Sequence, residues 1–354
     1  MIPQVVIDKV LSKAQETASH SWEYGTVFEA LLEYRDPHYS IFHDPFPEGK
    51  IPELTVEDVE ALRYVKPFIQ TNSARLCEGN APDNPYLSAV NRQLHDLLST
   101  TPRYSNGAIS HRDAYPSLWA DFIYMVPPAL AYHGVFTSDI GMLKESVRQC
   151  QLYCEVLGTS KGYWQHIANA EGTDSVKSDD GAWCTSNAWA AAGMTRVLAT
   201  LRRSQYESET ADEQKTLLDM TKGILDGAIE TDTDASGLLR NYLDDETWFT
   251  EVAGTALMAA TVFRMAVLEP GKFGERYVGW ATRKLEAVSR HLDEETGVAA
   301  PVINSLKEGQ RTPLNGINPE GQAFVVLLYA AWRDWRTVAD NASIATTGSH
   351  ASRT

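Results

Sequence analysis

Apolar residues recur through most of this chain with the spacing of amphipathic helices, and no other feature restricts its fold as strongly. Leu218, Leu225 and Ile229 illustrate the pattern, because separations of seven and four residues return a side chain to the same helix face. Alternation typical of strands is confined to short segments near 236–243 and 297–303. The periodicity therefore predicts an all-α protein.

Helix boundaries are indicated by residues that favour helix ends. Gly134 and Gly158 suit helix C-termini, and Pro116 suits a first helical turn. Together with the periodicity, these signals predict helices near residues 4–19, 22–35, 54–71, 85–100, 116–133, 138–157, 182–203, 209–230, 247–268, 271–292 and 319–338.

About eleven helices in a chain of 354 residues are expected to stack as antiparallel hairpins. An open solenoid of hairpins would show a repeat of fixed period, and the sequence has none. A closed toroid of about six hairpins, the (α/α)6 barrel, accounts better for the chain length and the number of helices. Since no linker divides the chain, residues 1–339 are predicted to form one domain, and the small, polar residues 340–354 a disordered tail.

The formal net charge of −16 restricts the partners of the protein. Nucleic acid and anionic membrane surfaces repel such a chain, so neither is expected as its main partner. The first 20 residues alternate charged and apolar side chains without a signal-peptide core, and no stretch of about 20 apolar residues could span a bilayer. We therefore expect a cytoplasmic protein that acts on a small molecule.

The four cysteines do not point to a disulfide framework or a metal site. Cys150 and Cys154 lie one turn apart on an apolar helix face, where a disulfide would be strained, and Cys77 and Cys184 lie far from them in the sequence. The chain has no histidine cluster with metal-ligand spacing, no P-loop, no dinucleotide-binding glycine motif and no nucleophile elbow. Reduced, structural cysteines, no metal and no cofactor are expected.

Asp121 is the first candidate for chemistry, because it is the only acid between Ala114 and Ser138. Its surroundings are the apolar sequence PSLWADFIYMVPPALAYHG. Burial among such residues raises the pKa of a carboxyl group, which can then hold a proton near neutral pH and deliver it as a general acid. The alternative is a structural Asp that is hydrogen-bonded to a backbone amide or an arginine.

Aromatic residues and two histidines gather around the predicted interhelix loops. His111 and His166 each precede a predicted helix and are candidates for substrate contact, although a single histidine is more often structural. Flat aromatic faces suit sugar rings and other planar ligands, whereas core packing is the simpler explanation for any one ring. The aromatic residues concerned are Tyr115, Trp119, Tyr163, Trp164, Trp183, Trp189 and Trp248.

Several segments between Ser21 and Trp332 carry a family resemblance. In chain order they read SWEYGTVFEALLE, PRYSNGAISHRDAYPSLWADFIYMVPPALAYHG, GYWQH, AWCTSNAWAAAGMTRVL, LLRNYLDDETWFTEVAGTALM and NPEGQAFVVLLYAAW. They resemble the family 105 glycoside hydrolases, the unsaturated rhamnogalacturonyl hydrolases, and more distantly the unsaturated glucuronyl hydrolases of family 88. The second segment is specific, and the others are weak individually.

The resemblance implies an (α/α)6 barrel and an unusual glycoside hydrolysis. In that family a carboxylic acid protonates the C4=C5 double bond of an unsaturated uronic acid, water adds at C5, and the resulting hemiketal collapses to release the neighbouring sugar. Asp121 matches the acid. The positions that match the family's pocket lining are Tyr24, His111, Trp119, His166, Trp183 and Trp189.

Two positions depart from the family pattern. Thr185 stands where the family has an arginine that grips the substrate carboxylate, and a neutral hydroxyl cannot provide a bidentate charged contact. The family's second active-site Asp corresponds to a run from Lys66 to Arg75 that contains no acid, with Ile69 as the best match. The loss of one charged contact costs about a hundredfold in affinity. A changed substrate is therefore predicted.

Three functions remain open at this point. The first is a family-105-like enzyme in which Asp121 protonates an electron-rich double bond or a leaving oxygen of an unsaturated sugar or enol ether. In the second, the fold cyclises, hydrates or isomerises a small natural product, which Thr185 and the missing second Asp favour. The third is a non-catalytic binding protein, for which Asp121 would be dispensable.

Overall fold

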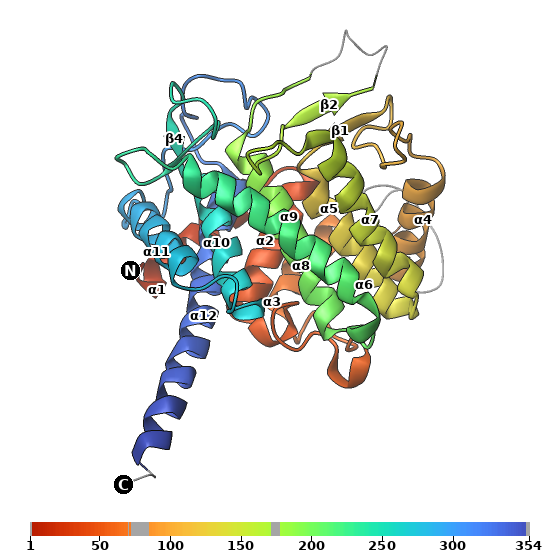
Figure 1. Ribbon diagram of the computed structural model, residues 1–354, viewed down its shortest axis with the longest axis horizontal. Helices are drawn as coiled ribbons and strands as arrows, with labels where there is room; N and C mark the ends of the chain where they lie inside the picture. The colour runs from red at the N-terminus through yellow and green to blue at the C-terminus, as the bar shows by residue number, and fades with distance from the viewer. Residues whose placement is uncertain (1, 70, 72–84, 171–177, 352–354) are drawn as a thin grey trace.

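The computed structural model describes residues 2–69, 71, 85–170 and 178–351, without the side chains of 85–89 and 343–351. Regular structure in these residues is almost entirely helical, as predicted (Figure 1). The helices are α1 (Gln4–Thr17), α2 (Ser21–Arg35), α3 (Glu60–Val65), α4 (Pro85–Ser99), α5 (Phe122–Met125), α6 (Pro127–Thr137), α7 (Ile140–Leu157), α8 (Cys184–Arg203), α9 (Ala211–Glu230), α10 (Val252–Leu268), α11 (Glu275–Arg290) and α12 (Pro319–Ala351).

The helices form an inner and an outer layer. Inside, α2, α12, α10 and α8 pack side by side in that order, and α5 and α6 pack against α8. Outside, α1 packs on α12, α11 on α10, α9 on α8, and α7 on α6. Side chains on every face of α8 and α10 are buried, whereas α11 buries only one stripe. Helices that are apolar all round belong inside a large core, so composition decides the layer.

Contacts between the inner helices show that four of them run parallel. Near their first residues, α2 is joined to α12 by Trp22 and Glu320, and α8 is joined to α10 by Thr185 and Glu251. About twelve residues further along, Glu33 of α2 contacts Arg196 of α8 and Arg264 of α10. Because the first residues of these helices contact one another, the N-terminal ends of α2, α8, α10 and α12 lie together at one end of the ring. We call it the N-terminal end.

Two short two-stranded sheets lie among the connecting loops. Strand β1 (Ser117–Trp119) pairs antiparallel with β2 (Ile167–Asn169), and β3 (Leu239–Arg240) pairs antiparallel with β4 (Thr250–Glu251). The first sheet places Trp119 opposite Ile167, and the N–H of Ala120 donates to the carbonyl of His166 at 3.0 Å. This pairing brings the chain before α5 against the chain around His166.

The predicted helix near 116–133 is correct only from Phe122 onward. Residues 117–119 form β1 because their backbone pairs with β2, and the following helix is broken into α5 and α6. Pro127 lacks an N–H and therefore begins a new helix at its first turn. The strand predicted near 297–303 is wrong, since only Ala299 there forms an isolated bridge, to Leu292.

Two further boundaries differ from the prediction. The predicted helix 54–71 is reduced to α3 and a 3-10 turn at Lys66–Phe68, because Pro67 removes a helical donor, and residue 70 lies outside the described residues. In contrast, α12 continues to Ala351, so residues 340–351 are helical instead of the disordered tail that we predicted. A helix already nucleated on the core extends at little cost. It projects beyond the ring in Figure 1, and 352–354 lie outside the described residues.

The core and the thiols agree with the sequence analysis where the structure describes them. One cluster of buried apolar residues extends from Ile2 to Ala331. Cys150, Cys154 and Cys184 are free, whereas Cys77 lies outside the described residues. In the described part of the chain, every helix is too short or too polar to span a lipid bilayer.

Gly193→Ala in α8 is expected to destabilise the protein by about 1–3 kcal/mol, because overpacking at a close backbone contact has that cost. An added Cβ would lie 2.2 Å from the carbonyl oxygen of Ile123, two residues after Asp121. Chemical denaturation measures the change. The control is Gly279→Ala in α11, where the nearest atom is Arg283 Nη1 at 3.8 Å and alanine favours the helix. Equal effects of the two substitutions would contradict the close approach of α5 to α8.

Candidate active site

The centre of the candidate site is His166, whose side chain is fully buried between two carboxylates. Its Nδ1 lies 2.9 Å from Asp179 Oδ2, and its Nε2 lies 3.4 Å from Asp121 Oδ2. Burial lowers the pKa of His166, but the two carboxylates outweigh burial, and the pKa is raised. The two carboxylates therefore favour the protonated form of the imidazole.

Asp121 lies immediately before α5 and is 15% exposed. Burial raises the pKa of its carboxyl group, but the neighbouring His166 outweighs burial and holds the pKa below its usual range. The raised pKa predicted from the apolar sequence is therefore wrong, because the partner lies 45 positions further along the chain. The atoms Asp121 Oδ2 and His166 Nε2 are both buried, and neither makes a hydrogen bond within the described residues.

Asp179 links the buried histidine to an open cleft. The Tyr242 hydroxyl donates to Asp179 Oδ2, and the Gly181 N–H donates to Oδ1 at 3.1 Å. Burial raises the pKa of Asp179, but His166 and Tyr242 outweigh burial and lower it. Asp179 and Tyr242 line a cleft of about 490 Å³ whose other walls are Ser178 and residues 307–310. Sequence reasoning missed both residues, because each stands in a polar loop without a recognisable pattern.

Aromatic rings form one wall of the site. His111 stacks on Trp119 with ring centroids 5.1 Å apart, and burial lowers the pKa of His111 to about 4, so this ring is neutral at pH 7. The Arg112 guanidinium lies over the Trp119 ring, 4.3 Å from its centroid. Trp119 and Trp183 both contact the His166 ring. Four of the predicted site residues, His111, Trp119, His166 and Trp183, therefore converge with Asp121.

Trp183 is held in place by the loop that follows β3. Its Nε1 donates to Asn241 Oδ1 at 2.9 Å, and Asn241 Nδ2 donates to the carbonyl of Glu308 at 3.0 Å. The N–H of Cys184 donates to the carbonyl of Asn241 at 2.8 Å. A single asparagine therefore joins the start of α8 to the cleft wall.

Thr185 lies in the first turn of α8 and is buried. Its hydroxyl donates to Glu251 Oε1 at 3.4 Å, and Glu251 caps α10 by accepting from the N–H groups of Ala253 and Gly254. Burial raises the pKa of Glu251 to about 7 despite these donors. The hydroxyl of Thr185, a predicted substrate-binding residue, is thus hydrogen-bonded to the buried acid Glu251.

Glu320 is a second buried acid that sequence reasoning missed. It lies in the first turn of α12, and Trp22 Nε1 of α2 donates to its Oε2 at 3.2 Å. Burial, together with the charge of Asp121, raises the pKa of Glu320 to about 8. The signal was present in the sequence, because Glu320 precedes the long apolar run from Ala323 to Ala331.

Two predicted site residues belong to neighbouring clusters. Tyr24 stacks on Phe68 with ring centroids 3.8 Å apart. Trp189 is buried between Tyr124 and Phe324, at 4.3 Å and 4.6 Å, and packs in the interior of the ring. Its spacing of six residues from Trp183 turns it to a different face and depth of α8. Trp189 is therefore a core residue in this structure.

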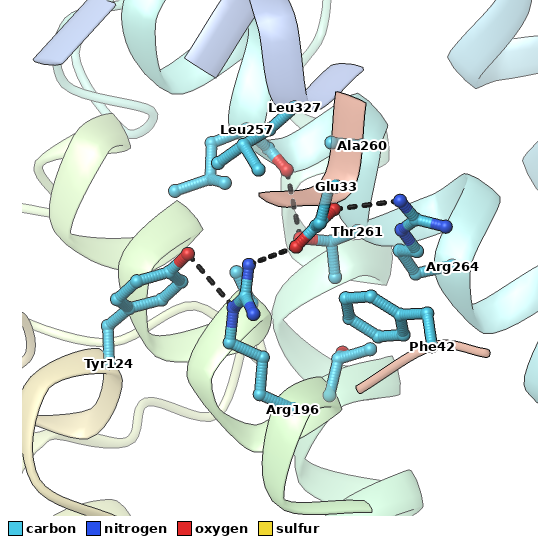
Figure 2. Close-up of a pocket in the computed structure, with 11 residues that line it drawn as sticks. Glu33, Phe42, Tyr124, Arg196, Leu257, Ala260, Thr261, Arg264 and Leu327 are labelled. Carbon is cyan, nitrogen blue, oxygen red and sulfur yellow. Dashed lines mark hydrogen bonds and ion pairs between the residues drawn. The ribbon is translucent and has the colours of Figure 1, made fainter. Parts of the chain in front are cut away.

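A smaller cavity lies deeper in the ring, as Figure 2 shows. Arg196 contacts Glu33 and the Tyr124 hydroxyl there, and Arg264 Nη2 donates to Glu33 Oε2 at 2.7 Å. Phe42 lies beneath both guanidinium groups. Because the cations are already paired with carboxylates, this cavity offers no free charge to a ligand. We assign it to the scaffold.

The side chains of His166, Asp179 and Glu308 form the one group in the described residues with metal-ligand character, with ligand atoms within 4.8 Å of one another. These donor types suit a divalent cation. The His166 Nδ1, however, is already hydrogen-bonded to Asp179. A proton on the imidazole balances the negative charge of Asp179 in the way that a bound cation would. The site chemistry below therefore uses only the protein's own groups.

Comparison with known proteins assigns the family. The model of Glycosyl Hydrolase Family 88 matches residues 4–333. The chain belongs to this family. It is accordingly an enzyme of the glycoside hydrolase type, and family membership indicates a carbohydrate-type substrate. A search of curated protein sequences gives no significant match.

Solved structures share the fold of this family 88 chain. A protein described as a possible member of family 105, from Salmonella enterica serovar Paratyphi A, has a TM-score of 0.70 at 16% identity, over 95% of this chain and 94% of its own. A family 105 glycoside hydrolase from C. acetobutylicum has a TM-score of 0.65 at 13% identity, over 94% and 99%. An unsaturated glucuronyl hydrolase specific for heparin has a TM-score of 0.60 at 12% identity, over 94% and 96%. The predicted (α/α)6 barrel is confirmed.

Asp179→Asn is expected to lower the pKa of His166, because an opposite charge at this distance typically shifts a pKa by about 1–3. The imidazole pKa is measured by NMR titration and requires no substrate. The matched control is Tyr242→Phe, which removes a hydrogen bond to Asp179 but leaves its charge, and should change the pKa of His166 less. An unchanged His166 pKa in Asp179→Asn would show that this carboxylate does not hold the proton.

Proposed function

We propose that this enzyme hydrates an electron-rich double bond of an unsaturated sugar or a related cyclic enol ether, and that Asp121 and His166 share the proton that is transferred. The observation that supports the proposal is the buried imidazole between Asp121 and Asp179, next to aromatic rings and an open cleft. Family 88 membership supports the same class of substrate.

In the resting state the shared proton resides on His166, because the pKa of His166 is raised and that of Asp121 is lowered. A bound substrate excludes water and makes the charged pair less favourable. The proton of His166 Nε2 then passes over 3.4 Å to Asp121 Oδ2. Neutral Asp121 is the acid that protonates the double-bond carbon, while Asp179 keeps the N–H at His166 Nδ1.

The second half of the reaction returns the proton. Protonation of the double bond leaves a carbocation that the ring oxygen stabilises, and Asp121 is now a carboxylate beside it. Asp121 accepts a proton from the attacking water as the C–O bond forms, and the proton passes back to His166. The net change is the addition of one water, after which the hemiketal opens and releases the attached group. One carboxyl group therefore acts as acid and then as base.

Asp121→Asn is expected to reduce kcat on unsaturated galacturonyl-rhamnose by about 10²–10⁴-fold, the range for removal of a general acid–base group. Loss of absorbance of the conjugated double bond measures the rate. Asp219→Asn on the outer helix α9 is the control, because Asp219 is exposed and pairs only with Lys215 there. Turnover that survives in Asp121→Asn would sink the assignment of the acid.

A second candidate function, the conversion of a small uncharged natural product, is favoured by Thr185. The hydroxyl of Thr185 is engaged with the buried acid Glu251, and the resemblance to family 105 implies an arginine at this position. Recognition of a neutral substrate fits this distribution of charge.

The methyl ester of unsaturated galacturonyl-rhamnose separates these candidates from a uronate-specific enzyme. We expect kcat/KM for the ester to equal or exceed that for the free acid, because Thr185 replaces the family's arginine, whose charged contact with the carboxylate is normally worth about a hundredfold. Paired kinetics at pH 7 measure the ratio. A preference of a hundredfold or more for the free acid would mean that another cation holds the carboxylate.

A further inference from the structure

Glu320 has one carboxyl oxygen that the described residues leave without a hydrogen bond. Its Oε2 accepts from Trp22 Nε1 at 3.2 Å, whereas Oε1 is buried and makes no hydrogen bond within the described residues. The residue as a whole is 2% exposed. A buried polar atom without a partner costs about 1–3 kcal/mol, so such atoms in a native protein need an explanation.

The unpaired oxygen lies at the same end of the ring as Asp121. Glu320 is in the first turn of α12, and its partner Trp22 is in the first turn of α2. Asn318, which caps α12, donates to the Ile303 carbonyl at 2.8 Å and to Ser305 Oγ at 3.0 Å. The loop fixed in this way continues to residues 307–310, which line the cleft at Asp179.

Three buried polar atoms at this end share the lack of a hydrogen bond within the described residues. They come from separate elements: Glu320 Oε1 from α12, Asp121 Oδ2 from the residue before α5, and His166 Nε2 from the residue before β2. Asp121 Oδ2 and His166 Nε2, however, lie 3.4 Å apart and form an ion pair with each other. Glu320 Oε1 has no such ion pair within the described residues, and its lack of a hydrogen bond near the charge of Asp121 points to a bound molecule.

We propose that Glu320 is a substrate-binding acid of this site, whose Oε1–H donates a hydrogen bond to an uncharged oxygen of the bound sugar or enol ether. This inference rests on the proposed function, because it places that molecule beside Asp121.

The protonation state of Glu320 decides the direction of the hydrogen bond. Burial and the charge of Asp121 outweigh the neighbouring Ser305 and Trp22 and raise the pKa of Glu320 to about 8, so most of the group is neutral at pH 7 and offers a donor. The neighbouring charges on Asp121 and Glu23, which raise this pKa, also disfavour an anionic ligand group. A hydroxyl, ether or carbonyl oxygen is the acceptor that suits a neutral carboxyl group in this setting.

The kinetic test uses the methyl ester of unsaturated galacturonyl-rhamnose between pH 6 and 9.5. For the wild type we expect kcat/KM to fall above about pH 8 as Glu320 loses its proton. Glu320→Gln keeps a donor that does not titrate, so the decline above pH 8 should disappear. Glu320→Leu removes the donor and should raise KM about tenfold relative to the wild type below pH 8, where the wild-type carboxyl group keeps its proton, and this corresponds to one neutral hydrogen bond of about 1.4 kcal/mol.

Trp22→Phe distinguishes substrate binding from a structural role. It removes the hydrogen bond to Oε2 but leaves the Glu320 carboxyl group in place. We expect this variant to retain the decline above pH 8. If Trp22→Phe and Glu320→Gln change the pH profile in the same way, Glu320 only anchors α12 to α2 and the proposal is overturned. An unchanged KM in Glu320→Leu would overturn it as well.

Infrared difference spectra of the wild type and Glu320→Gln with the same ester keep this test separate from the proposed function. At pH 7 we expect one carbonyl band of a protonated carboxyl group that the wild type has and Glu320→Gln lacks, beside the contribution of Glu251 that both proteins share, and a shift of the Glu320 band when the ester binds. A shift without turnover would support the role of Glu320 and refute hydration of this substrate. Absence of the band, or a band that does not respond to the ester, would refute the role of Glu320.

Discussion

Glu33 accepts hydrogen bonds from both Arg196 and Arg264, and this buried contact fixes how the inner helices lie against one another. Removal of one partner from a buried ion pair typically costs about 3–5 kcal/mol, because the remaining charge is stranded. The contact joins α2, α8 and α10 about twelve residues from their starts. It therefore sets the axial register of three helices whose first turns carry Trp22, Thr185 and Glu251.

With the register of the helices fixed, the active-site chemistry depends on which of the neighbouring carboxyl groups are protonated. Asp121, Asp179, Glu251 and Glu320 lie around the N-terminal end, and His166 is the group that contacts two of them directly. The two acids beside the imidazole have lowered pKa values, whereas burial raises those of the other two. Ionised and neutral carboxyl groups thus coexist at one pH, which allows one to exchange protons while another donates a hydrogen bond.

The sequence was sufficient for the architecture and for the location of Asp121, because helical periodicity and a lone acid in an apolar segment are local signals. It was insufficient for the pKa of Asp121, which depends on His166, the residue that precedes β2 and that the pairing of β1 with β2 brings close. The break of the predicted helix at residues 117–119 has the same cause, since β1 exists only through its pairing with β2. Trp189 packs between Tyr124 and Phe324, a depth in α8 that its proximity to Trp183 in sequence does not reveal.

Alignment of the inner helix starts at one end also divides this molecule into parts with different tolerance to change. Segments 102–121, 164–170 and 303–318 connect helices and carry much of the site, while the ring beneath them is held by its own buried contacts. Mutations in these connecting segments can alter substrate selectivity while the ring beneath them stays folded. A combinatorial library confined to them would therefore explore new substrates on an unaltered scaffold.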